Sequence, residues 1–95
     1  MIRAIRNRLK KYGLLECVER VCKARHVPLE EVLGDTQRPF IAHVRHEVWA
    51  TMHVMGLRYC EIARLFGRHH TTVLTGVRRH GARTGVPSGT LEFAS

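Results

Sequence analysis

Apolar residues recur at spacings of three and four along most of this chain, which is the period of an amphipathic helix. A basic helix is expected over residues 1–13, with apolar positions Ile2, Ile5, Leu9 and Tyr12. A second helical pattern covers residues 14–26. No alternation with a period of two is sustained, so the pattern predicts an all-α fold.

The longest apolar stripe follows a short helical turn and a polar loop. Pro28 suits the first turn, and Gly34 ends it. The stripe beyond the loop consists of Phe40, Ile41, Val44, Val48, Trp49, Met52 and Met55. We expect one helical domain over residues 14–81, and a flexible tail over residues 82–95 because that segment is rich in Gly, Ser and Pro.

Residues 59–80 have the spacing of a helix-turn-helix. Two steeply crossing helices need a small residue at their contact, here Ala63, and a turn residue that tolerates positive φ, here Gly67. Val73 returns to the core. The outer face then carries His69, His70, Thr71, Thr72, Thr75, Arg78 and Arg79. Short polar groups at a helix start can enter a major groove while arginines reach phosphates; the alternative is an ordinary helical hairpin with a solvated face.

Charge favours the first interpretation. The 95 residues carry a net charge of +8. Residues 1–11 hold five bases and no acid, residues 58–83 hold six bases and one acid, and the segment between them is nearly neutral. A basic face of this kind indicates a polyanionic partner, most simply nucleic acid. The basic segment 1–13 is interpreted as docking on the core and adding phosphate contacts, or else as binding a protein or an anionic membrane.

The sequence contains little evidence for a metal site or a catalytic site. "HEVWA" lacks the second histidine of H-E-x-x-H, and His43 and His46 have no cysteine or pair of acids to complete a site. The three cysteines are odd in number and read as core groups. No nucleophile pattern or phosphate loop occurs. We therefore expect no enzyme, metal or cofactor. With no apolar run long enough for a membrane span, we also expect a cytoplasmic, nucleoid-associated protein.

The run "EIARLFGRHHTTVLTGV" resembles the signature of the DNA-binding C-terminal domain of the bacterial replication initiator DnaA, approximately E-I-G-x-x-F-G-G-R-D-H-S/T-T-V-x-x-A. The upstream segments "VCKARHVPLEEVLG" and "RPFIAHVRHEVWATMHVM" are similar to the same domain. The resemblance spans about residues 21–79 and implies an initiator-type helix-turn-helix that binds double-stranded DNA.

The resemblance also implies roles for particular residues. The His70-Thr71-Thr72 run is expected to read base edges, and Arg68 and Arg45 to contact the backbone. Arg38 lies near a family arginine that enters the minor groove. The full expected DNA-binding set is Arg38, Arg45, His46, Arg68, His69, His70, Thr71, Thr72, Thr75, Arg78 and Arg79.

Two departures from the signature affect the expected target. The family's Gly-Gly is reduced to Gly67, and its aspartate before H-T-T is His69. An imidazole can donate as well as accept hydrogen bonds, so we expect a target that differs from the initiator's box.

Since this chain lacks the initiator's ATPase, we expect a transcription regulator that resembles phage-like or gene-transfer-agent activators. It would bind as one molecule per site and work with RNA polymerase or a co-activator. The alternatives are a replication-associated protein that binds or competes for initiator boxes, and an RNA-binding or nucleoid-coating protein with little sequence preference.

Overall fold

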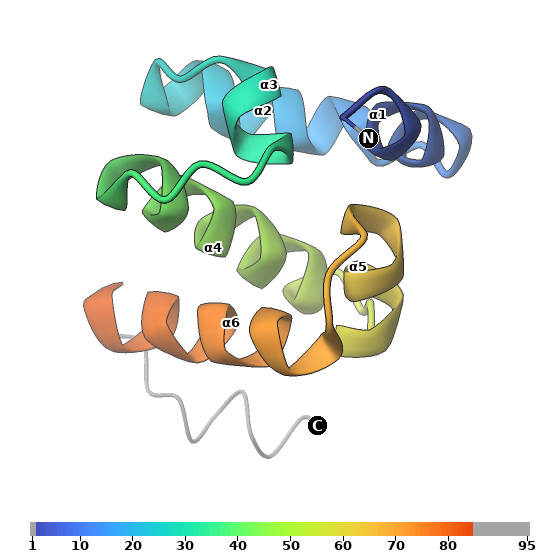
Figure 1. Cartoon of the computed structure of the whole chain (residues 1–95). Coiled ribbons are helices and arrows are strands. Elements are labelled where there is room, and N and C mark those ends of the chain that lie inside the picture. Colours follow the sequence, from blue (N-terminus) through green and yellow to red (C-terminus); the bar gives the residue numbers. More distant parts are fainter. Residues whose placement is uncertain (1, 85–95) are drawn as a thin grey trace.

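A computed structural model describes residues 2–84 of the chain and shows a helical domain (Figure 1). Within that range all regular structure is helical, which confirms the predicted all-α fold. The helices are α1 (Ile2–Lys11), α2 (Leu15–Arg25), α3 (Leu29–Leu33), α4 (Pro39–Val54), α5 (Tyr59–Phe66) and α6 (His70–Thr84).

Helix α4 is the centre of the fold and lies between the layer of α1–α3 and helix α6 (Figure 1). Its apolar stripe is buried through Val48, Trp49 and Met52, and the Trp49 ring meets Phe66 edge-on with centroids 6.0 Å apart. The stripe is shorter than predicted, because Phe40 and Met55 at its two ends are each 56% exposed. Residues at helix ends follow the period but extend beyond the core.

Helix α1 packs against α2, α3 and α5 and belongs to the same core. Ile5 and Leu9 are buried, whereas Tyr12, which shares their spacing, is 63% exposed just after the helix ends. The Arg8 side chain fixes α1 to α5, because its Nε donates to the Leu65 carbonyl over 3.3 Å.

The helix-turn-helix forms from α5 and α6 as its spacing predicts. Gly67 adopts φ 66° and ψ 35°, a left-handed conformation that glycine adopts without steric cost. The N–H groups of Gly67 and Arg68 both donate to the Ala63 carbonyl and close the end of α5. Val73 and Val77 return to the core with 0% and 1% exposure.

Two expectations need correction. Helix α6 continues through Thr84, so residues 82–84 are helical and not part of a tail; residues 85–95 of the predicted tail lie outside the described residues. Cys22 is a core residue, and burial raises its pKa to about 11 because the thiolate is poorly solvated there. Cys60 is exposed, so the core role predicted for it is wrong.

Candidate nucleic-acid interface

His69 caps the start of α6. Its Nδ1 lies 3.3 Å from the Thr71 backbone N–H, which donates to it, and 2.7 Å from Thr71 Oγ1. A nitrogen that accepts an N–H hydrogen bond carries no proton, so the neutral ring holds its proton on Nε2. An imidazole therefore performs the capping function that short polar residues usually perform. The His69 ring also lies against that of His70, with centroids 4.4 Å apart and planes tilted by 30°.

Polar side chains of α4 and α6 line a shallow groove of about 270 Å³ beside this helix start. The threonines Thr71, Thr72 and Thr75 are exposed along one edge. The complete lining is His46, Thr71, Thr72, Thr75, Gly76 and Arg79. The structure thus brings together five of the residues predicted from the sequence and adds Gly76, which the sequence reasoning did not select.

Gly76 allows α6 to approach α4 closely. A Cβ at this position would lie 2.7 Å from Trp49 Cε3 and 2.8 Å from His46 Cδ2, well inside ordinary contact distance. The approach buries much of His46, whose ring centroid is 5.7 Å from that of Trp49. A glycine flanked by a polar threonine and a core valine could have suggested such a contact, but sequence alone does not identify the partner helix.

His46 is held in its neutral form. Burial lowers its pKa to about 4, and the positive charges of Arg83 and Arg79 act in the same direction. Its Nδ1 makes no hydrogen bond within residues 2–84. The imidazole therefore contributes an uncharged polar edge to the floor of the groove, between the threonines of α6 and the core.

Arg45 is buried, although the resemblance implies that it contacts the DNA backbone. It is 6% exposed, and its guanidinium donates to three carbonyls, those of Val32 (2.8 Å), Glu31 (3.1 Å) and Thr36 (3.2 Å). Two of these belong to the last turn of α3, where carbonyls have no partner inside the helix. Burial lowers the pKa of this arginine from its ordinary value. Arg45 therefore holds the loop between α3 and α4 in place, and is not available at the surface for a phosphate.

Arg68 connects the same loop to the helix-turn-helix. Its Nη2 donates to the Gly34 carbonyl and lies 2.9 Å from Asp35 Oδ1, with 22% of the side chain exposed. Arg38, by contrast, is 73% exposed, and within residues 2–84 its guanidinium makes a single contact, 3.6 Å from the Glu31 carboxylate. Of the two arginines near the turn, Arg38 is the one whose guanidinium is available to a ligand.

Three of the predicted residues on α6 are exposed: His70, Arg78 and Arg79. Helix α6 has no acidic residue over its 15 positions. The acids near the loop, Asp35 and Glu31, are already paired with arginines. The surface formed by the α6 start, the groove and the Arg38 loop, which we call the α6 face, is therefore polar and positively charged.

Between residues 2 and 84, no group of three or more His, Cys, Asp or Glu side chains is arranged to hold a metal ion. None of the helices described is long and apolar enough to cross a membrane.

Comparison with known proteins identifies one family. A family model described as "Bacterial dnaA protein helix-turn-helix" matches residues 16–79. Searches among curated proteins and among solved structures found no match. The matched range contains the whole predicted DNA-binding set and begins after α1.

Proposed function

Because the chain belongs to the bacterial DnaA helix-turn-helix family, we propose that it reads double-stranded DNA sequence-specifically as a transcription regulator, an activator that works with a partner protein. The family match confirms the resemblance seen in the sequence and supports DNA binding. The α6 face supports our proposals for which residues read DNA and which process they serve.

The exposed polar start of α6 is the observation that best supports DNA reading. His70, Thr71 and Thr72 are exposed on its first turn, and Thr75 follows one turn later. Hydroxyl and imidazole groups can bond base edges, and threonine methyls pack on the thymine methyl. Arg78 and Arg79, farther along the helix, are placed to contact phosphates. In this proposal Arg38 extends the contact into the neighbouring minor groove, while Arg45 and Arg68 order the loop that presents it.

His69 is the residue at which we propose that base preference differs from that of the initiator. With its proton on Nε2, the exposed edge of the ring is a donor, whereas an aspartate at this position can only accept. A donor suits the N7 and O6 acceptors of guanine, while a carboxylate suits the amino group of cytosine. A target that differs from the initiator's box favours a role at other sites, which is why we place the protein at promoters.

The alternative function is a replication-associated protein that binds or competes for initiator boxes. The retained His70-Thr71-Thr72 run favours it, because those residues match the initiator signature directly. Binding mapped across the genome by immunoprecipitation of the tagged protein separates the two. Peaks at promoters, with expression of the adjacent genes falling on deletion, support the activator. Peaks confined to an origin support the alternative, and diffuse coverage would contradict both.

A further inference from the structure

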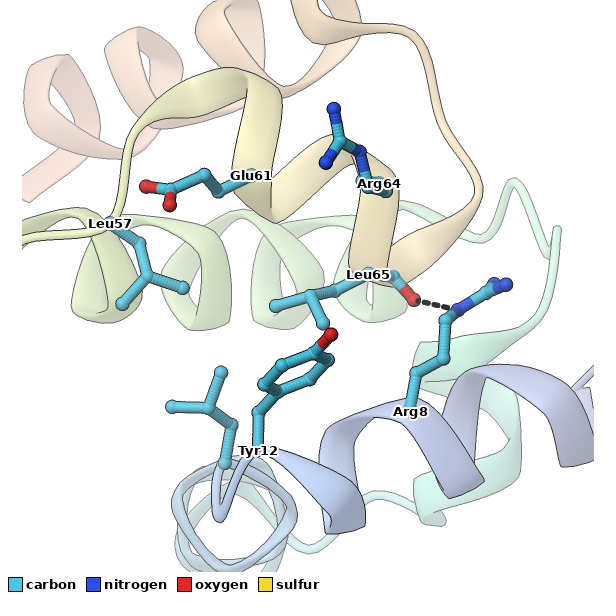
Figure 2. Close-up of a pocket in the computed structure, with 7 residues that line it drawn as sticks. Arg8, Tyr12, Leu57, Glu61, Arg64 and Leu65 are labelled. Atoms are coloured by element: carbon cyan, nitrogen blue, oxygen red, sulfur yellow. Dashed lines mark hydrogen bonds between the residues drawn. The ribbon is translucent and has the colours of Figure 1, made fainter.

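A second surface hollow lies between α1 and α5, on residues that the α6 face does not use. It has a volume of about 370 Å³ and is lined by Arg8, Tyr12, Leu14, Leu57, Glu61, Arg64 and Leu65 (Figure 2). This volume falls within the range of pockets that bind ligands, roughly 300–1,000 Å³. We call it the α1–α5 pocket.

The floor of the α1–α5 pocket is apolar. Leu14 and Leu57 are half-buried, Leu65 is buried, and the exposed Tyr12 ring stands beside Leu65 (Figure 2). Nearby, the Met55 sulfur lies 3.9 Å from that of Cys17. Met55 is 56% exposed and the adjoining Val54 is 74% exposed. Two exposed apolar residues, Val54 and Met55, therefore occur close in sequence to the pocket's Leu57.

The charged side chains at the rim of the pocket are Arg8, Arg64 and Glu61, so positive charge prevails there. Arg64 is exposed and makes no hydrogen bond or ion pair within the described residues, and Arg8 uses only its Nε, toward the Leu65 carbonyl (Figure 2). One oxygen of the Glu61 carboxylate accepts from the Arg58 backbone N–H at 2.8 Å in a capping box, so the rim carries two guanidinium groups and one carboxylate. The Tyr12 hydroxyl makes no hydrogen bond within residues 2–84. The donors left at the rim match a ligand with carboxylates.

The pocket depends on a part of the chain that the family model does not match. Arg8, Tyr12 and Leu14 precede residue 16, where the match begins. None of the lining residues belongs to the α6 face. The addition of α1 thus creates a concave apolar surface while leaving the DNA-reading surface free.

We propose that the α1–α5 pocket binds an acidic amphipathic helix of a partner protein. Apolar side chains spaced three or four residues apart enter between Leu14, Leu57 and Leu65, in the helix-in-groove mode. Carboxylates on the flank of that helix pair with Arg64 and with the free Nη groups of Arg8. The inference rests on the proposed function, for which it supplies the partner's contact, and it allows DNA and partner to bind together.

The test uses the full chain and random 16-residue peptides displayed on phage. Peptides selected on the wild-type protein are expected to carry Leu, Ile or Phe three or four residues apart, with Asp or Glu nearby. A synthetic peptide from this selection should bind roughly tenfold more weakly to Arg64→Glu. Tyr12→Ala should also weaken it, and Arg64→Gln should lie between. Lys23→Glu makes the same change of charge on α2, outside the pocket, and should leave affinity within about twofold.

Binding of the same variants to a selected DNA duplex separates the two proposals. Arg64→Glu should change DNA affinity by less than Arg79→Glu does. If specific DNA binding is absent but the peptide pattern holds, the proposed function fails and the pocket stands. The inference is overturned if selected peptides lack acids, or if Arg64→Glu and Lys23→Glu act alike. It also fails if peptide binding shifts the NMR signals of the α6 face, or if the pocket proves to hold a second copy or the chain's own residues 85–95.

Discussion

Gly76→Ala is expected to destabilise the protein, although the same change in an open helix would stabilise it. Gly76 is buried on the face of α6 that meets α4. A Cβ there would lie 2.7 and 2.9 Å from two ring carbons of Trp49 and 2.8 Å from His46 Cδ2. The variant therefore sets helix propensity against packing at the contact that positions α6.

The magnitude follows from two opposing terms. Replacing glycine by alanine inside a helix contributes about 1 kcal/mol of stability. Overpacking a filled core costs about 1–3 kcal/mol. Trp49 is 1% exposed and held by Phe66, so the ring cannot withdraw and the cost lies in the upper part of that range. The net loss is about 1–2 kcal/mol, or about 5–10 °C in Tm for a domain of this size.

Thermal and guanidinium unfolding followed by circular dichroism measure this loss. Thr75→Ala is the matched control, because the neighbouring side chain is exposed and its truncation should change stability by no more than about 0.5 kcal/mol. Adding His46→Ala to Gly76→Ala should recover part of the loss, since it removes one of the contacts. A Gly76→Ala protein as stable as the wild type, or more stable, would refute the close packing of α6 on α4.

Three further predictions concern named side chains. Arg45→Met should lower the free energy of unfolding by about 3 kcal/mol, because it leaves the carbonyls that Arg45 satisfies without their donors. Urea titration measures this loss, and an unchanged midpoint would contradict the role of Arg45 in holding the loop between α3 and α4. The pKa of His46 is about 4, below its ordinary value of 6.5, so the unfolded chain binds this proton first and stability should fall by up to about 3 kcal/mol as pH drops from 6.5 to 4. His46→Gln should flatten this dependence of stability on pH. If stability falls equally with pH in the wild type and in His46→Gln, His46 is not the cause. His69→Asp should change the base preferred at one position in a randomised duplex library; an unchanged site would contradict the donor role of Nε2.

The helix-turn-helix could be predicted because its signals are local. A glycine that closes α5 and valines at helical spacing determine the turn and the buried face within about 20 residues, and the structure has Gly67 and Val73 in those states. The exposed set on α6 followed from the same periodicity. The assignment of these residues to DNA contact stays a prediction that the structure makes geometrically reasonable.

What could not be predicted depends on contacts between distant segments. Arg45 looks like a surface arginine in the sequence, yet the carbonyls it satisfies come from α3 and the following loop. The capping role of His69 depends on its rotamer, which no residue pattern specifies. Tyr12 follows the apolar spacing of α1 but lies beyond the helix end, where the core no longer covers it. Periodicity shows which residues share one face of a helix, but only the tertiary structure shows which other segments contact that face.

Equilibrium binding to a duplex enriched from a random library, compared with a permuted duplex of the same composition, tests sequence reading by α6 most directly. At physiological salt we expect a preference of at least about 10³-fold for the enriched site. Thr72→Ala should relax that preference, while Lys23→Glu retains it. Equal affinity for the two duplexes, lost uniformly as salt is added, would show a nonspecific phosphate binder and contradict sequence reading by α6.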